Sequence, residues 1–398
     1  MIIAHSQFYT SEQIASLLIN CIELENVNVI LDLGAGNGSL TCAAYKTWTT
    51  AKIITADIDA NNCTALLNKG FNAKHVDCLL PRLNEFLNTG FETVDVCVCN
   101  PPYESIEHTA FIESLLKRAN LYINRREKNT TTDLVFLAYN LLFLRPGGVL
   151  GIIVPYSIMA GRKFSKIRES LMDNYYLERV VELPECSFSY TEAKTGILII
   201  RKEPKGTRKT NICTVKKDFE LSDYLTPPKE QLIERLDYSF YNWRRFQKTR
   251  ENNLYNEMIN EITIIRGKYT HEELKRKMHP FFHTTYFDKD NIDWTYKYDS
   301  SEKSVISRGA FLLARVGKRC VGKVKYIETG HIQISDCIYA IHVPQEYVLD
   351  FKDLFRSREY YDFIQNNIRG VCSLYLCKCD LKAFLSQKLY EFRRNKMR

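Results

Sequence analysis

Short apolar runs alternate with amphipathic stretches over the first half of the chain. The runs VNVILDL, AKIITADI, TVDVCVC and GGVLGIIV each end at a Gly, Asp, Asn or Pro, as buried strands of a parallel sheet do. Residues 60–69, 106–124 and 132–144 lie between these runs and have the periodicity of amphipathic helices. The alternation predicts an α/β fold built on a Rossmann-like doubly wound sheet.

Three further elements belong to this half. Residues 11–25 have helical periodicity, with Ser11 as a candidate N-cap. The stretches ERVVEL and TGILIIRK, near 178–183 and 195–202, predict strands. The second of them is suited to an antiparallel edge of the sheet.

The pattern changes after a polar segment with Pro and Gly, KEPKGTRKT. A long polar helix is expected around 229–262, followed by β-rich sequence and by helices at about 350–368 and 380–396. We therefore predict two domains, residues 1–205 and residues 206–398, the second of the α+β class.

Composition narrows the class of protein. No apolar run is long enough to cross a bilayer, and the N-terminus lacks the features of a signal peptide, so we predict no membrane partner. The 13 cysteines are scattered, as in reduced cytosolic proteins, which predicts a cytoplasmic location. Cys372, Cys377 and Cys379 form no C-x-x-C pair, so we predict no metal site.

Charge is distributed unevenly along the chain. Residues 1–205 carry 20 Lys+Arg and 22 Asp+Glu, whereas residues 206–398 carry 35 and 25. A basic second half indicates an anionic polymer as its partner, and a merely solvated basic surface is the alternative.

A glycine-rich turn follows the first apolar run. LDLGAGNGS puts Asp32, Gly34 and Gly36 where a strand becomes a helix, so the backbone can approach a ligand closely. The next strand ends at Asp57, where an acid can accept both hydroxyls of a ribose. An acid before the turn favours a cationic amino-acid group over a pyrophosphate, and S-adenosylmethionine (SAM) fits both ends. A dinucleotide site, and a helix N-cap role for Asp57, are the alternatives.

These segments resemble a known family. LDLGAGNGS, TADID, VDCLL and CNPPY, in this order, resemble the class I SAM-dependent amino-methyltransferases. QFYTS, upstream of them, is similar to the segment that closes over the cofactor in the gamma class of DNA adenine-N6 methyltransferases. The resemblance covers about the first 200 residues. It implies that the cofactor contacts are Asp32, Gly34, Gly36, Asp57, Asp77 and Asn100, together with Phe8, Tyr9 and Thr10 of QFYTS.

The tetrapeptide Asn100-Pro101-Pro102-Tyr103 supplies the chemistry. An exocyclic amine on a purine is a poor nucleophile because its lone pair is delocalised into the ring. The Asn100 side-chain oxygen and the Pro101 carbonyl, fixed by Pro102, can hold both amine hydrogens out of the ring plane and free the lone pair. Tyr103 offers a face on which the base can stack.

A base inside a duplex cannot be held this way, so a DNA substrate has to be flipped out. In the gamma class an aromatic residue before the last antiparallel strand supplies a second stacking face. ECSFSYTEAKTGILII offers Phe188 and Tyr190, and Phe188 matches the pattern better. Packing within a loop is the alternative role for Phe188.

The second half has a weaker resemblance. ISRGAFLLARVGKRCVGKVKYIETGHIQISDCIYAI is similar to the target-recognition domains of type I specificity subunits and type IIG restriction enzymes. Basic side chains on its glycine-punctuated strand pair can position phosphates or read guanine edges. The candidate DNA contacts are Arg308, Arg315, Lys318, Arg319, Lys323 and Lys325.

Together these observations predict a site-specific methyltransferase that carries a methyl group from SAM to adenine N6 of double-stranded DNA. A restriction–modification role is expected, with a cognate restriction endonuclease encoded separately as a further partner. Two alternatives stay open: an RNA base-amine methyltransferase that holds RNA with its basic half, and a DNA-binding specificity module with a decayed methyltransferase fold.

Overall fold

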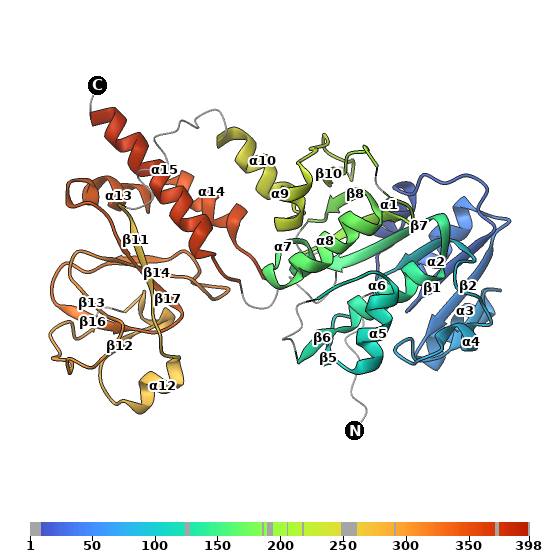
Figure 1. Ribbon diagram of the computed structural model, residues 1–398, viewed down its shortest axis with the longest axis horizontal. Coiled ribbons are helices and arrows are strands. Elements are labelled where there is room, and N and C mark those ends of the chain that lie inside the picture. The colour runs from blue at the N-terminus through green and yellow to red at the C-terminus, as the bar shows by residue number, and fades with distance from the viewer. Residues whose placement is uncertain are drawn as a thin grey trace. The chain divides into compact units, whose positions relative to one another are not determined.

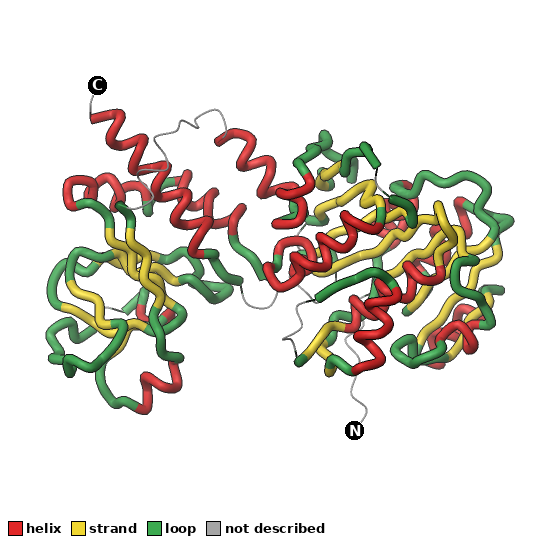
Figure 2. Tube along the Cα trace, viewed as in Figure 1, coloured by secondary structure: helices red, strands yellow, loops and turns green. Residues whose placement is uncertain are grey.

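The chain divides into two compact units, Met1–Tyr241 and Asn242–Arg398. Figure 1 labels their helices and strands, and Figure 2 distinguishes helices, strands and loops. The computed structural model describes residues 9–123, 128–184, 187–188, 194–204, 206–216, 219–247, 261–289, 292–370 and 374–396.

A mixed sheet, with eight strands in the described residues, forms the centre of the first unit (Figures 1 and 2). β1, β2, β3, β4 and β7 pair in parallel with one another, and β10 pairs in parallel with β8. β9 is antiparallel to both β7 and β8. The predicted α/β class is confirmed. In spatial order, the strands are β10 (Asn211–Thr214), β8 (Tyr176–Glu182), β9 (Thr195–Arg201), β7 (Leu144–Pro155), β4 (Val94–Cys99), β1 (Val29–Leu33), β2 (Lys52–Asp57) and β3 (Asn72–His75).

Helices cover both faces of this sheet. Val96 and Val98 of β4 lie in a hydrophobic core shared with α1 and α2. Successive side chains of a strand point to opposite faces, and the Cys97 thiol donates to the Asn140 carbonyl of α6 (Sγ–O 3.6 Å). The helices of this unit are α1 (Glu12–Asn20), α2 (Ser39–Thr47), α3 (Ala60–Asn68), α4 (Leu83–Leu87), α5 (Ala110–Arg118), α6 (Thr132–Phe143), α7 (Tyr156–Ala160), α8 (Ser165–Asn174) and α9 (Lys229–Glu234). α10 (Tyr238–Gln247) begins in this unit and continues past Tyr241 into the second.

Two local predictions can be compared with these elements. Ser11 is the N-cap of α1, as predicted, and its hydroxyl accepts from the backbone N–H of Ile14 (3.3 Å). The antiparallel direction of β9 is also confirmed, but its predicted place at an edge is wrong. Six of its seven residues, Thr195–Ile200, are buried, and this continuous burial belongs to a strand with a neighbour on each side.

The first unit continues past the domain boundary expected after residue 205. β10 extends the sheet beside β8. Arg235 and Asp237 are fully buried as an ion pair (Nη2–Oδ2 2.6 Å), and the Tyr156 hydroxyl donates to the same carboxylate (2.8 Å). Arg235 has extended backbone (φ −156°, ψ 151°). The single helix expected over 229–262 is therefore interrupted between α9 and α10.

A two-stranded ribbon joins the end of β4 to α6. β5 (Ser105–Glu107) pairs antiparallel with β6 (Asn129–Thr131), and α5 lies between them in the sequence. β6 is followed directly by the first residue of α6. The ribbon therefore brings the start of α6 back to the segment that follows β4.

Helices and short, mostly antiparallel strands make up the second unit, in keeping with the predicted α+β class. One helix was expected at 350–368, but Ser357 caps a new helix there, so two form. Phe311, Phe351 and Phe384 share its main core. Its elements are β11 (Thr263–Arg266), β17 (Ile338–His342), β14 (Phe311–Ala314) and β15 (Val324–Tyr326) in one sheet, β12 (Phe281–Phe282), β16 (His331–Ile334) and β13 (Val305–Ser307) in another, and helices α12 (His271–Arg276), α13 (Val348–Leu354), α14 (Arg358–Asn367) and α15 (Lys378–Lys396).

Among the described residues, no helix combines the length and the apolar character needed to cross a membrane.

Candidate active site

Candidate site residues follow the carboxyl ends of four parallel strands, which lie together along one edge of the large sheet. Gly34 and Gly36 follow β1, Asp57 ends β2, Asp77 comes shortly after β3, and Asn100 follows β4. The strand order changes direction at β1, which has β2 on one side and β4 on the other. Open α/β sheets bind their ligands at such a switch point.

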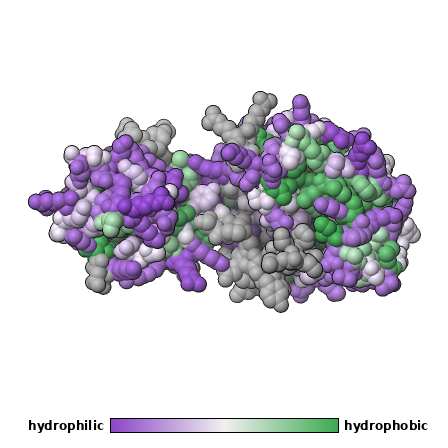
Figure 3. All heavy atoms as spheres, turned by 90° about the horizontal axis from the view of Figure 1, so that it is seen from below, coloured by the Kyte–Doolittle hydropathy of each residue, from purple (hydrophilic) through white to green (hydrophobic). Residues whose placement is uncertain are grey.

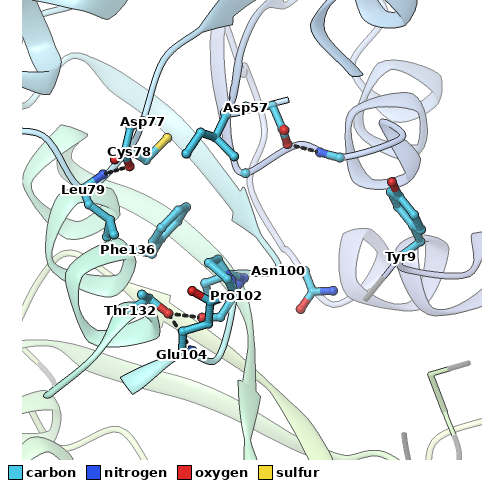
Figure 4. A pocket seen from close by; sticks show the side chains of 14 residues that line it. Tyr9, Asp57, Asp77, Cys78, Leu79, Asn100, Pro102, Glu104, Thr132 and Phe136 are labelled. Carbon is cyan, nitrogen blue, oxygen red and sulfur yellow. Dashed lines mark hydrogen bonds between the residues drawn. The ribbon is translucent and has the colours of Figure 1, made fainter. Parts of the chain in front are cut away.

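A pocket lies at this edge (Figure 4). Its empty volume is about 890 Å³, part of it open to solvent, which suits a small-molecule site. A smaller pocket adjoins it, and Tyr9, Gly34, Gly36 and Asn100 line both. The main pocket is lined by Tyr9, Gly34, Gly36, Asp57, Ile58, Asp77, Cys78, Leu79, Asn100, Pro101, Pro102, Glu104, Thr132 and Phe136.

The glycine loop brings backbone to the pocket wall. Gly34 and Gly36 have φ values of +72° and +52°, which residues with a side chain rarely adopt. A Cβ on Gly34 would lie 3.1 Å from the Phe136 ring, and a Cβ on Gly36 would lie 3.4 Å from the Tyr9 ring. Both positions therefore require glycine for the turn, and Gly34 requires it for the close approach of a ring as well.

Asp57 closes this loop. It is 6% exposed. Its Oδ2 accepts from the backbone N–H of Gly36 (2.7 Å), and its Oδ1 accepts from that of Asp59 (2.8 Å). Asp59, and not Asp57, is the N-cap of α3, so the N-cap interpretation of Asp57 is wrong. Asn62 Nδ2 also donates to Oδ1 (3.3 Å). A carboxylate has about four lone-pair sites, so Asp57 can still accept from one hydroxyl of a ligand.

Asp32 is fully buried and does not line either pocket. The Thr41 hydroxyl donates to its Oδ2 (2.6 Å), whereas its Oδ1 has no hydrogen-bond partner among the described residues. Burial raises the pKa of Asp32 to about 7, and the nearby Asp57 carboxylate adds to the rise against the effect of the Thr41 hydrogen bond.

The Asn100 carboxamide is held at both ends. Its Nδ2 donates to the Thr10 hydroxyl (3.0 Å), and its Oδ1 accepts from the Tyr103 hydroxyl (2.9 Å). Burial raises the pKa of Tyr103 far above its usual range, so the phenol keeps its proton. An amide with a donor contact on one side and an acceptor contact on the other has one preferred orientation.

Two residues of α6 that the sequence pattern does not single out also line the pocket. The Thr132 hydroxyl donates to the Pro102 carbonyl (2.5 Å) and accepts from the backbone N–H of Glu104 (3.0 Å), as Figure 4 shows. Phe136 forms an apolar wall beside Gly34. Apolar spacing predicts the helix, but it does not say which of its turns reaches the pocket.

Other predicted cofactor contacts are also at the pocket. Tyr9 lines both pockets, and Thr10 lines the smaller one. Asp77 lines the main pocket, where its Oδ1 accepts from the backbone N–H of Leu79 (2.8 Å). Phe8 lies outside the described residues.

The two residues predicted to stack on the target base, Tyr103 and Phe188, lie outside both pockets. Tyr103 and Phe188 are both described, and neither lines the main pocket or the smaller one. Phe188 is 4% exposed and packs in the core that α1 and α2 share with the sheet. This position agrees with the packing alternative for Phe188, and a stacking role stays a prediction. Tyr190 lies outside the described residues.

Among the six basic candidates in the second unit, Arg315, Lys323 and Lys325 donate hydrogen bonds to neighbouring residues. These contacts use a charged side chain as a donor to a carbonyl or carboxylate. Arg315 Nε donates to the Asp336 carbonyl (2.8 Å), Lys323 Nζ to Asp288 Oδ2 (2.6 Å) and Lys325 Nζ to the Lys289 carbonyl (2.7 Å).

The other three candidates, Arg308, Lys318 and Arg319, are exposed. Arg308 precedes β14, whereas Lys318 and Arg319 follow it, so the strand separates them into two groups. Hydrophilic residues cover most of the face of this unit visible in Figure 3.

No group of three or more His, Cys, Asp or Glu suited to a metal ion occurs in the part of the chain that the structure describes. Cys377 is buried and Cys379 is exposed, and Cys372 lies outside the described residues.

Comparison with known families assigns the chain to a class. The family described as N-6 DNA Methylase matches residues 4–273, which is more than half of the chain. The chain belongs to this family.

Individual relatives are more distant. The chain is 26% identical over 248 residues to the Type I restriction enzyme MjaVIII methylase subunit of Methanocaldococcus jannaschii, covering 58% of this chain and 42% of that protein. It is 25% identical over 311 residues to the Type I restriction enzyme MpnII methylase subunit of Mycoplasma pneumoniae, covering 68% and 54%. The chain thus spans about half the length of these curated relatives.

A solved structure shares the fold over most of the chain. The type IIG restriction endonuclease BpuSI is similar with a TM-score of 0.50 and 13% identity, covering 93% of this chain and 57% of that chain. At this identity the likeness concerns the fold alone.

The buried Asp32 predicts a dependence of stability on pH. Its folded-state pKa of about 7 exceeds the ordinary value of about 3.9. Between about pH 4 and about pH 7, therefore, Asp32 keeps its proton in the folded chain and has lost it in the unfolded chain. The free energy of unfolding should therefore fall as pH rises from about 4 to about 7, by ~1.4 kcal/mol per unit of pKa difference. Asp32→Asn should remove most of this fall, as measured by urea unfolding at pH 5 and pH 8 without ligand.

Asp133 is an internal reference for this experiment. Its pKa is raised to about 6 by burial, so the fall in stability that remains in Asp32→Asn should be smaller in Asp32→Asn/Asp133→Asn. Equal pH dependence in the wild type and Asp32→Asn would show that Asp32 ionises at the same pH in both states.

Proposed function

We propose that the chain is a methyltransferase that transfers a methyl group from SAM to the N6 amine of adenine in double-stranded DNA. The observation that carries the proposal is the Asn100 carboxamide, held by Thr10 and Tyr103 beside the glycine loop. Membership in the N-6 DNA Methylase family supports the reaction and the substrate. The likeness to methylase subunits of type I restriction enzymes supports them further.

The residues of the pocket fit SAM. Asp57 has a lone pair available to a hydroxyl of a ribose, and Leu79 and Phe136 offer apolar contact to a purine ring. Asp32 carries a buried oxygen without a hydrogen-bond partner in the described residues, and a cationic amino-acid group near the glycine loop would offset its negative charge. When bound, SAM supplies an electrophilic methyl group.

Asn100 and Pro101 activate the amine by orienting it. A side-chain carbonyl oxygen has two lone pairs, so Asn100 Oδ1 can accept an amine hydrogen while Tyr103 keeps its hydrogen bond. The Pro101 carbonyl is the second acceptor, and the following proline restricts Pro101 to extended conformations. Two acceptors that draw both hydrogens out of the ring plane free the nitrogen lone pair. Orientation of this kind contributes ~7–11 kcal/mol when the geometry is right.

The target base must leave the duplex to reach these acceptors, which costs a few kcal/mol. Tyr103 is the candidate for stacking against it, because the phenol is tied to the same carboxamide that accepts the amine. Phe188 could stack only after leaving the core in which it packs.

The second unit is the candidate for reading the DNA sequence. Its exposed Arg308, Lys318 and Arg319 suit contacts with phosphates or guanine edges. The Lys323–Asp288 pair is also exposed, and such pairs contribute only ~0–1 kcal/mol, so Lys323 can exchange its partner for a phosphate. The names of the relatives support a restriction–modification role, with the nuclease on a separate chain.

Asn100→Ala tests the catalytic assignment. It should lower the rate of methyl transfer by at least about 100-fold, the scale of losing one preorganised polar group. SAM affinity should fall far less than the rate, because Asp57 and the glycine loop are untouched and Asn100 is only one of the residues that line the pocket. Transfer of tritiated methyl groups to unmethylated duplex DNA and to total RNA measures the rate, and calorimetry measures the affinity.

Asn174→Ala is the matched control, because it removes a carboxamide of α8 that does not line the pocket. It should retain wild-type activity. A wild-type rate in Asn100→Ala would contradict the catalytic assignment, and methylation of RNA in place of DNA would contradict the substrate.

Tyr103 has two proposed contributions, a ring that stacks and a hydroxyl that orients Asn100. Tyr103→Phe keeps the ring and removes the 2.9 Å hydrogen bond, so it should slow methyl transfer by about tenfold, the effect of roughly 1.4 kcal/mol. Tyr103→Leu removes both and should be slower again, since stacking on an aromatic ring is worth ~1–3 kcal/mol per base. Single-turnover rates with saturating SAM and DNA provide the comparison. Equal rates for the Phe and Leu variants would eliminate the stacking role.

A further inference from the structure

Thr132 connects the segment after β4 to α6. It is 1% exposed and lines the main pocket, although it lies 30 residues beyond Pro102 in the sequence. Its hydroxyl donates to the Pro102 carbonyl (2.5 Å) and accepts from the backbone N–H of Glu104 (3.0 Å), and its own backbone N–H donates to the Glu104 carbonyl (3.0 Å). Figure 4 shows the two contacts of the hydroxyl.

These contacts restrict the backbone on both sides of Tyr103. The ring of Pro102 fixes its φ, and the hydrogen bond from Thr132 holds its carbonyl, which leaves little freedom in ψ. The bond from the Glu104 N–H holds the next peptide group. Tyr103 therefore leaves a backbone whose two flanking peptide groups are fixed, and its hydroxyl reaches Asn100 Oδ1 from there.

The ribbon that follows strengthens this connection. The pairing of β5 with β6 begins at Ser105 and Thr131, the residues next to Glu104 and Thr132. The same helix also carries Phe136, whose ring lies 3.1 Å from where a Cβ on Gly34 would be. The start of α6 thus contacts the segment Asn100–Glu104 with one residue and the glycine loop with another.

We propose that Thr132 is a positioning residue for methyl transfer, acting through Pro102 and Tyr103 on the Asn100 carboxamide. This role rests on the proposed function of the site. The Thr132 hydroxyl uses its single proton for Pro102 and a lone pair for Glu104, so a residue with the same shape and no hydroxyl leaves both backbone groups without this partner. The groups assigned to SAM, Asp57 and the glycine loop, have no hydrogen bond with Thr132 among those described.

Thr132→Val is the main test, because valine keeps the shape and loses the hydroxyl. The kcat for methyl transfer to DNA should fall about 10- to 100-fold, while the KM for SAM changes less than about threefold. Thr132→Ser keeps the hydroxyl and should restore kcat to within about threefold of the wild type. A Thr132→Ala variant compared with Thr132→Ser tests the hydroxyl a second time, because the two side chains differ only in that group, in case the valine variant does not fold.

Thr130→Val is the matched control. Thr130 lies two residues away on β6, is 4% exposed, and its hydroxyl has no hydrogen-bond partner in the described part of the chain. This variant should keep the wild-type kcat. Thermal unfolding and SAM calorimetry on every variant report folding and cofactor affinity independently of turnover.

The outcomes separate the inference from the function on which it rests. An active wild type with a slow Thr132→Val, a rescued Thr132→Ser and an unaffected Thr130→Val supports the positioning role. Three outcomes overturn that role alone. They are a wild-type kcat in Thr132→Val, a kcat in Thr132→Ser as low as in Thr132→Val, and a rise in the KM for SAM of Thr132→Val as large as its fall in kcat. A folded wild-type chain that binds SAM and methylates no DNA overturns the proposed function, and the role of Thr132 with it.

Discussion

The candidate site depends on the hydrogen bonds that fix the Asn100 carboxamide at the end of β4. β4 is a good foundation because it pairs with β1 and β7 and all six of its residues are buried. The segment that follows has two prolines with no backbone donor, so the strand cannot continue to pair. Its geometry is instead set by side chains from other elements, Thr10 before α1 and Thr132 at the start of α6. A rigid strand end held in this way preorganises two acceptors without a strong base.

Much of the first unit follows from its sequence for a clear physical reason. Parallel strands are buried on both faces, so they appear as continuous apolar runs that periodicity detects. The polar residues that end those runs, such as Asp57 and Asn100, then fall at one edge of the sheet. Asp77 follows β3, which no apolar run predicts, and its assignment came from the resemblance to a known family. The same reasoning failed for β9, where direction was predictable but position in the sheet was not, because that position depends on which strand β8 pairs with.

The residues that could not be predicted depend on long-range contacts. Thr132 reaches Pro102 only because the β5–β6 ribbon folds back, and no local pattern encodes that return. Phe188 precedes the antiparallel strand β9 as a stacking residue would, yet packing against α1 and α2 places it in a core. Arg235 and Asp237 are charged residues of a kind typical of an exposed helix, but both are buried. They form an ion pair with each other, and the Tyr156 hydroxyl donates to the Asp237 carboxylate. A charged residue can be buried when an ion-pair partner is buried with it. Arg235 and Asp237 are such a pair, and the first unit extends beyond them to Tyr241.

The second unit shows the limit of reasoning from charge. Its net positive charge is a property of composition, whereas Arg315 and Lys325 already donate to backbone carbonyls. Candidates for nucleic-acid contact are therefore better chosen by exposure than by charge alone, which favours Arg308, Lys318 and Arg319. The chain also spans about half the length of its curated relatives. The activity of a whole relative can therefore depend on segments that this sequence does not match.

The central claim is that Asn100 Oδ1 and the Pro101 carbonyl together hold the amine of the target base. The most direct measurement is a crystal structure of the chain with a SAM analogue and duplex DNA that contains its methylation site. An extrahelical adenine should be found with N6 about 3 Å from both oxygens, within hydrogen-bonding distance. A base bound elsewhere, or an adenine in the pocket whose N6 contacts neither oxygen, would contradict the account.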